Sequence, residues 1–194
     1  MTTPTAARRA RELEDRRARI VATARTLAEE QGWEAVTTRR LADAIEYSQP
    51  VLYGHFPHGR TQIVTAVALE GFEELAAALA AAAPGAPTDV DRVRALVTAY
   101  LDYAEQHPAT YDAMFLLPVL VPFASHDTPP VVRAGFDAIT ATLRTLEQPP
   151  ADVPTTAEVL WGALHGLVAL RRAGRLPATQ QPQRIATLVA LVTR

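Results

Sequence analysis

The sequence contains no cysteine, no lysine and no apolar run of about 18 residues. The absence of cysteine excludes a disulfide framework and thiolate metal sites, and it fits a reducing cytoplasm. Because there is no long apolar run and no apolar segment near the N-terminus, we expect neither a membrane span nor a signal peptide. No stretch alternates polar and apolar residues with a period of two, so we expect no strand. These absences favour an all-α, soluble, cytoplasmic protein with no membrane partner.

The chain has 194 residues, 48% of them hydrophobic, which suffices for one small module and one larger core. Its net charge of −2 is unevenly distributed. Residues 1–60 hold ten arginines and eight acidic residues, whereas residues 61–194 hold nine arginines and thirteen acidic residues. The N-terminal part is therefore the part suited to phosphate. Within it, residues 1–19 hold six arginines, which could add salt-dependent phosphate contacts or could form a solvated extension.

Apolar residues recur at spacings of three and four along most of the chain, which predicts about nine helices. Proline and glycine mark the breaks, most clearly at residues 84–87 and 148–154, and residues 118–123 are too rich in proline for a stable helix. The expected helices cover roughly residues 20–31, 38–45, 48–55, 61–82, 88–107, 110–117, 130–146, 155–172 and 183–194.

Residues 48–56 are the most informative segment. Ser48 can cap a helix, Pro50 can occupy its first turn, and Leu52 and Phe56 are spaced to face a core. A helix of two turns is not stable alone, so the preceding helix, capped by Thr37 or Thr38, has to support it. Two short helices with polar side chains on the outer side of the second indicate a helix-turn-helix. The side chains left on that outer side are those of Gln49, Tyr53 and His55.

These residues carry a resemblance to a known family. Residues 14–65 are similar to the DNA-binding domain of the tetracycline-repressor (TetR) family of transcriptional regulators, through the helix ending at residues 30–32, then residues 37–44 and residues 48–56. Trp161, His165 and Gly166 resemble the Trp-His-Gly signature in the C-terminal domain of one TetR subgroup. The resemblance implies a ligand-responsive homodimer, with a DNA-binding domain at residues 1–60 and a helical effector-binding and dimerisation domain at residues 61–194.

The resemblance also implies how DNA is bound. The third helix of each subunit enters the major groove of a palindromic operator, and a small organic effector changes the distance between the two reading helices, which must stay about 34–36 Å apart. Carried over by position, the resemblance implies phosphate contacts from Thr37, Tyr53, His55 and Arg60. It places Arg39, Ser48, Gln49 and Pro50 near the base edges. The alternative interpretation is that Thr37 or Thr38 only caps a helix and that Pro50 only begins one. The predicted DNA-binding residues are Thr37, Thr38, Arg39, Ser48, Gln49, Pro50, Tyr53, His55 and Arg60.

The sequence departs from the family pattern in two places. The turn before the third helix usually has a glycine, and Glu46 stands there instead, followed by Tyr47. A non-glycine residue either tolerates a left-handed conformation at a cost of about 1 kcal/mol or changes the turn. The lysine that usually opens the fourth helix is replaced by Arg60, one residue along.

The C-terminal part suggests an effector site and a dimer interface. Aromatic and polar residues on helices that must face one another suit an organic molecule, although most of them are equally suited to the core. The last two helices have apolar stripes wider than one subunit can cover, so we expect them to pack against their copies in a four-helix interface. The predicted ligand-binding residues are Tyr103, Met114, Phe115, Phe123, Phe136, Trp161 and His165.

Two other classes of function compete with a repressor. A helical small-molecule-binding or interaction protein without specific DNA binding is compatible with the acid at Glu46. An enzyme is less favoured, because the five histidines are scattered over separate elements and no nucleophile, base and acid converge. We therefore expect no catalytic residue, no metal and no cofactor.

Overall fold

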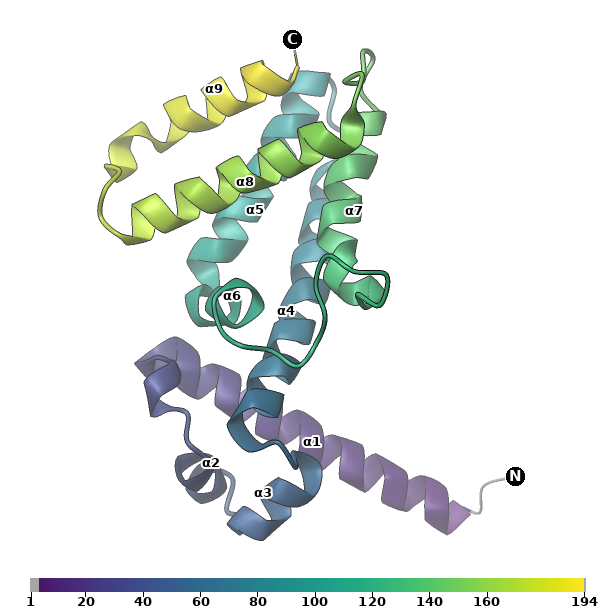
Figure 1. The fold of residues 1–194 in the computed structure, drawn as a ribbon, viewed down its shortest axis with the longest axis vertical. Helices are drawn as coiled ribbons and strands as arrows, with labels where there is room; N and C mark the ends of the chain where they lie inside the picture. The colour runs from purple at the N-terminus through teal and green to yellow at the C-terminus, as the bar shows by residue number, and fades with distance from the viewer. Residues whose placement is uncertain (1–3, 194) are drawn as a thin grey trace. The chain divides into compact units, whose positions relative to one another are not determined.

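The computed structural model describes residues 4–193, and within them it contains helices and no strand, which confirms the all-α expectation (Figure 1). All nine expected helices are present, and two short 3-10 helices accompany them. The elements are α1 Pro4–Gln31, η1 Trp33–Ala35, α2 Thr38–Ala44, α3 Gln49–His55, α4 Gly59–Ala82, α5 Asp89–Gln106, α6 Pro108–Phe115, α7 Pro130–Arg144, α8 Val153–Arg172, η2 Ala178–Gln180 and α9 Gln181–Val192.

The chain folds into two compact units. The first unit holds the described residues as far as Gly71 together with His107–Pro122, and the second holds Phe72–Gln106 and the chain from Phe123 onward. Helix α6 thus belongs to the same unit as α1, α2 and α3. The functional division into a DNA-binding domain (1–60) and an effector-binding domain (61–194) stays a prediction.

The core of the first unit forms where α1, α2, α3 and the first turns of α4 meet. The buried face of α1 presents one side chain per turn, and each short helix contributes only one or two anchors, so neither short helix could fold without the others. Burying each large apolar side chain stabilises the unit by about 1.5–3 kcal/mol. The anchors are Ile20, Ala24, Leu41, Leu52, Phe56, Ile63 and Val67.

Helix α6 is held against α1 by a set of directed hydrogen bonds. The Glu29 carboxylate accepts from the backbone N–H groups of Ala109 and Thr110, both at 2.9 Å, and from the Thr110 hydroxyl at 2.7 Å. The Trp33 indole N–H donates to the Ala109 carbonyl at 2.7 Å. On the side toward α4, a Cβ at Gly71 would lie 2.6 Å from Thr110 Cγ2, so only glycine allows this approach. A carboxylate of α1 therefore satisfies the free N–H groups at the start of α6.

The second unit is a bundle of α5, α7, α8 and α9 with the second half of α4. Helix α5 is buried over a wide face, but α9 buries only Val189. Helix α8 is long and apolar enough to cross a membrane by length and composition alone, and 22% of its most apolar stretch is buried inside the protein. It carries Glu158, Arg171 and Arg172, and it packs against α5 and α7 through Leu160 and its neighbours.

Helix α1 extends further toward the N-terminus than the apolar pattern predicted. It begins at Pro4 rather than near Ile20, and the side chains of residues 5–16 are all exposed. No apolar stripe is needed there, because alanine, arginine and glutamate are good helix formers and Arg8 pairs with Glu12 at 3.5 Å one turn later. The first three residues of the predicted leader lie outside the described part of the chain.

Candidate DNA-binding surface and effector site

Helix α3 separates its anchors from its outer face. Leu52 and Phe56 are fully buried, whereas Tyr53 is 46% exposed and Val51 38% exposed. Gln49 and the helix start around it are also exposed. The helix is thus held on the core by Leu52 and Phe56, and its opposite face is polar and aromatic. Recognition of base edges in the major groove requires such an exposed face on a fixed helix.

Two arginines of α1 fix the ends of α3. The Arg17 guanidinium lies 4.5 Å from the centre of the Phe56 ring and donates to the carbonyl oxygen of His55 at 3.3 Å. That carbonyl belongs to the last residue of α3, where a cation is favoured by the helix dipole. Arg19 donates to the Tyr47 hydroxyl at 3.3 Å in the turn before α3. The orientation of the third helix is therefore set by α1 at both ends.

The turn between α2 and α3 has the left-handed conformation that the sequence allowed. Glu46 has a φ of 57°, and the next residue, Tyr47, donates its N–H to the Ala42 carbonyl at 2.9 Å. This turn thus has a left-handed residue although that residue is not glycine. The cost is about 1–2 kcal/mol of backbone strain, and the Glu46 carboxylate is exposed beside α3.

The predicted DNA-binding residues differ in how exposed their side chains are and in whether these side chains already form hydrogen bonds within the protein. Thr37 caps α2, its hydroxyl accepting from the Arg40 N–H at 3.2 Å, whereas Ser48 stands at the start of α3 without a side-chain capping bond. Arg60 is turned inward: its Nε donates to the Val36 carbonyl at 3.1 Å and its Nη2 to the Trp33 carbonyl at 3.0 Å. Thr38 and His55 are half-buried. The exposed members are Thr37, Arg39, Ser48, Gln49, Pro50 and Tyr53.

Three of the predicted ligand-binding residues come together in the second unit. The ring centres of Phe136 and Trp161 are 6.2 Å apart, and those of Trp161 and His165 are 5.1 Å apart. The Tyr100 hydroxyl lies 3.2 Å from Nε2 of His165. Burial lowers the pKa of His165 to about 4, so the imidazole is neutral at pH 7. The cluster offers aromatic faces and uncharged polar atoms.

The other predicted ligand-binding residues have different surroundings. Met114 is fully buried and Phe115 packs on Tyr111, and all three belong to the first unit. In the second unit, the Tyr103 hydroxyl donates to Glu74 at 3.2 Å. Phe123 is 44% exposed, and its ring packs against Phe72, with the ring centres 5.9 Å apart. The predicted set is therefore divided between the two units, and Phe136, Trp161 and His165 are the members that lie in contact with one another.

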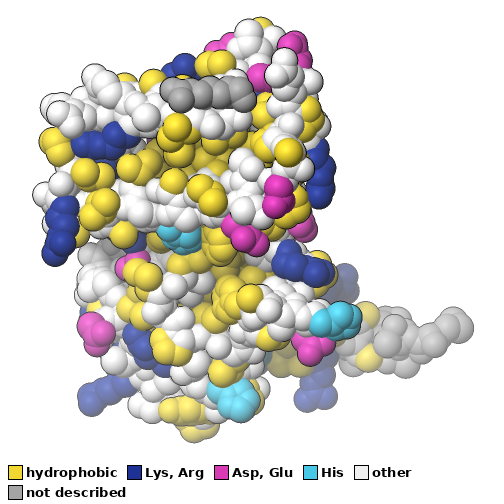
Figure 2. Space-filling model, turned by 45° about the horizontal axis from the view of Figure 1, so that its top comes forward, with side chains coloured by type: hydrophobic (Ala, Val, Ile, Leu, Met, Phe, Trp, Pro, Cys, Tyr) yellow, Lys and Arg dark blue, Asp and Glu magenta, His cyan; other side chains and the backbone are white. Residues whose placement is uncertain are grey.

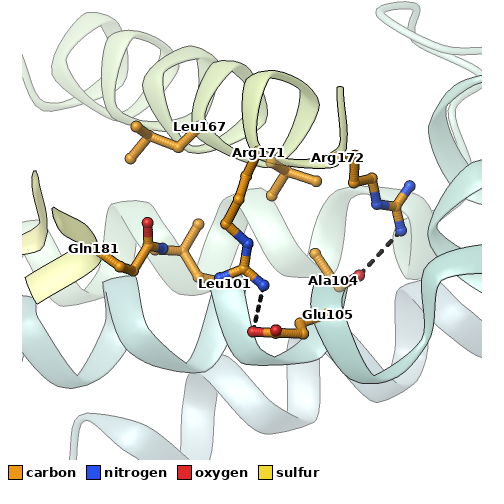
Figure 3. A pocket seen from close by; sticks show the side chains of 8 residues that line it. Leu101, Ala104, Glu105, Leu167, Arg171, Arg172 and Gln181 are labelled. Carbon is orange, nitrogen blue, oxygen red and sulfur yellow. Dashed lines mark hydrogen bonds and ion pairs between the residues drawn. The ribbon is translucent and has the colours of Figure 1, made fainter. Parts of the chain in front are cut away.

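A small cavity of about 30 Å³ lies between α5, α8 and the start of α9 (Figure 3). Its volume matches that of a water molecule rather than an organic ligand. Arg171 pairs with Glu105 across it, and this hydrogen bond lowers the pKa of the Glu105 carboxyl. Arg172 donates to the carbonyl oxygen of Ala104 at 3.0 Å. At this cavity, an ion pair and a hydrogen bond from two arginines therefore join α8 to α5.

Helices α8 and α9 leave an open apolar groove of about 700 Å³ between them. Leucines line much of it, and two of them, Leu170 and Leu191, are 42% and 62% exposed. Val159, four residues before the groove residue Ala163 on α8, is 68% exposed. Figure 2 shows hydrophobic side chains gathered on the unit that carries these helices. Exposed apolar patches are typical of surfaces that bind another protein, a membrane or a ligand.

Comparison with known proteins identifies the family. The sequence pattern of the tetracyclin repressor-like C-terminal domain matches residues 93–192, and that of bacterial regulatory proteins of the tetR family matches residues 20–67. The first match alone covers more than half of the chain. The chain belongs to the TetR family. It is a DNA-binding transcriptional regulator of the ligand-responsive kind, in a family of regulators rather than of enzymes.

Individual relatives agree with this assignment. The regulator is 28% identical over 158 residues to an uncharacterized HTH-type transcriptional regulator of Mycobacterium tuberculosis, covering 80% of this chain and 69% of the relative. A Rhodococcus sp. RHA1 protein of unknown function has the same fold, with a TM-score of 0.70, 24% identity and coverage of 91% and 90%.

Two further solved structures have the fold of this TetR-family regulator. RolR, crystallised with resorcinol, has a TM-score of 0.66 and 18% identity, with coverage of 95% of this chain and 89% of RolR. The TetR-family regulator PfmR of Thermus thermophilus has a TM-score of 0.61 and 19% identity, with coverage of 91% and 97%.

The sequence patterns missed the residues that hold these sites in place. Arg17 could have been found, because it precedes Ile20 and Ala24 by three and seven residues and so shares the buried face of α1. Glu29 gives no such signal, since its partners are 80 and 81 residues away in the chain. Among residues 4–193 no group of three acidic or histidine side chains is placed to hold a metal ion.

Proposed function

We propose that this regulator is a cytoplasmic repressor that binds a palindromic operator as a homodimer and is released by a small, uncharged organic molecule. The observation that carries the proposal is the outer face of α3, where exposed Gln49 and Tyr53 flank the buried anchor Leu52. A helix anchored from below and polar above is suited to the major groove.

We assign base contacts to the start of α3 and to Arg39 of α2. Gln49 can bond bidentately to adenine, Arg39 to guanine, and Pro50 or Val51 can meet a thymine methyl group. Ser48 is also placed near the bases, whereas Thr37, Thr38, Tyr53 and His55 are assigned to phosphates. Arg60 is the weakest member of this set, because two of its N–H groups are already bonded to carbonyls of the first unit.

The dimer is assigned to α8 and α9. Their open groove and the exposed side chains of Val159, Leu170 and Leu191 supply apolar area that a second copy would cover. Pairing of the same two helices from each copy gives a four-helix interface with twofold symmetry. Such symmetry matches a palindromic operator.

The effector is assigned to the cluster of Phe136, Trp161, His165 and Tyr100. Since His165 is neutral and the other three side chains carry no charge, the cluster favours an uncharged molecule with an aromatic face and a hydroxyl or carbonyl group. Resorcinol, with which the structurally similar RolR was crystallised, is a suitable first probe.

The decisive experiment is selection of binding sites from a random duplex library, followed by titration of the selected duplex over a range of salt. A palindromic site bound at least about a thousandfold more tightly than random DNA supports the repressor. Retention of every duplex to the same degree would instead favour an interaction protein that lacks specific DNA binding.

The same titration tests the assigned reading face. Replacement of Gln49 by alanine should weaken binding to the selected duplex by about tenfold or more, the loss expected for one bidentate base contact, with unchanged thermal stability. Gln106→Ala, at an exposed end of α5, is the matched control and should change neither property. Unfolding caused by Gln49→Ala would contradict its place on the DNA face.

A further inference from the structure

The N-terminal half of α1 is a charged helix that covers no core. Residues 4–19 precede the first buried side chain, Ile20, and Figure 1 shows this half of α1 projecting past α3 within the first unit. At 1.5 Å per residue it is about 24 Å long, the length of about seven base pairs of duplex DNA. It holds six arginines and three acidic residues, so its own charge is positive.

Two of these arginines show which side of α1 faces α3. Arg17 reaches the last carbonyl of α3 and Arg19 reaches Tyr47 just before α3 begins, so both ends of α3 lie on the side of α1 between these two side chains. Successive residues of a helix are rotated by about 100° around its axis. Arg16 therefore lies between Arg17 and Arg19 around the helix, about 60° from Arg19 and about 100° from Arg17. Arg9, seven residues earlier, lies about 20° from Arg16 on the same side.

Arg9 and Arg16 are exposed and have no ion-pair or hydrogen-bond partner among the described residues. The nearest acid on this side, Glu12, is paired with Arg8. Glu14 and Asp15 lie at least about 100° away around the helix. Arg9 and Arg16 are therefore two unneutralised cations, about 10 Å apart along the axis of α1, on the side of α1 that faces α3.

We propose that Arg9 and Arg16 bind phosphates of the duplex that flanks the recognition site, so that α1 extends the DNA interface beyond α3. Both arginines lie on the side of α1 that faces α3, on the half of α1 that extends past α3, and their charge is complementary to phosphate. The proposal rests on the proposed sequence-specific binding by α3. It adds a flanking contact that carries no base information and depends strongly on salt.

The test uses the whole chain and two duplexes. One duplex holds the selected site with about ten base pairs of flanking DNA on each side, and the other, the cut duplex, holds the same site without flanking base pairs. Arg9→Gln/Arg16→Gln is compared with Arg11→Gln/Arg94→Gln, which removes the same charge from another face of α1 and from an exposed position on α5, and which leaves the pair of Arg8 and Glu12 intact. Circular dichroism of both variants checks that α1 remains helical.

On the flanked duplex, Arg9→Gln/Arg16→Gln should reduce the slope of log K against log salt by about 1.8 and weaken binding roughly tenfold at low salt. The control variant should change the slope by less than half of that, and on the cut duplex the wild type and both variants should bind alike. Equal losses in both variants, or equal binding of the two duplexes by the wild type, would overturn the flanking contact. Absence of any selected site would overturn the proposed function itself.

Discussion

At the scale of the residue, Glu46 shows how one side chain can affect both stability and DNA binding. Its left-handed backbone is strained, and its exposed carboxylate lies beside the helix assigned to DNA. Glu46→Gly should raise the free energy of unfolding by about 1 kcal/mol and strengthen operator binding severalfold. Glu46→Gln separates the two effects, because it removes the charge and keeps the strain. Urea unfolding and operator titration measure them, and equal stability of the glycine and glutamine variants would contradict the strain.

His165 makes stability depend on pH. Its pKa is about 4 in the folded chain and about 6.5 when unfolded, so the unfolded chain binds a proton that the folded chain excludes between these values. Its contribution to stability is therefore complete above about pH 6.5, decreases as the pH falls and is lost below about 4. After allowance for solvent that reaches the ring, the loss is about 1–2 kcal/mol.

His165→Gln should remove that part of the pH dependence. Urea unfolding at about pH 7 and about pH 4.5 measures it, with His126→Gln, at an exposed histidine, as the control. A wild type and a His165→Gln variant that lose the same free energy between the two pH values would show that His165 is not held neutral by burial.

At the scale of the element, α6 depends on a carboxylate from another helix. Glu29 accepts three hydrogen bonds at the start of α6, and two of the donors are backbone N–H groups with no other partner within the helix. Glu29→Ala should lower the free energy of unfolding by about 2 kcal/mol, measured by urea titration. Glu30→Ala, at its exposed neighbour, should change it by less than about 0.5 kcal/mol. Similar losses in the two variants would mean that the capping bonds contribute little.

The elements themselves were largely predictable. All nine helices follow from apolar spacing and from proline and glycine breaks, because these patterns act over a few neighbouring residues. The start of α1 was not predictable in this way, since residues 5–16 are exposed and carry no apolar stripe. The inward turn of Arg60 and the capping of α6 by Glu29 were missed for a different reason: they join segments distant in sequence.

At the scale of the whole molecule, the proposed homodimer predicts the effect of a charge in the groove between α8 and α9. Leu191 is 62% exposed, so Leu191→Glu should leave the single chain folded while placing a carboxylate in the apolar interface. Sedimentation at micromolar concentration should show a monomer, and operator affinity should fall by about a hundredfold or more as the two half-sites are bound independently.

Leu116→Glu is the matched control, because Leu116 is 70% exposed but lies in the first unit. It should leave sedimentation and operator binding as in the wild type. A Leu191→Glu protein that sediments as the wild type does would exclude this part of α9 from the dimer interface.

The sequence by itself determined the helical class and the positions of the helices apart from the first half of α1. It also determined the division of the α3 segment into the anchors Leu52 and Phe56 and an outer polar face. Each of these depends on periodicity within one segment, which the order of residues contains directly. Only the tertiary structure decided which side chains meet across segments. It showed that Arg17 and Arg19 fix α3 and that Phe136, Trp161 and His165 form one cluster. Such contacts depend on how the helices pack, and packing distance is not encoded in any local pattern.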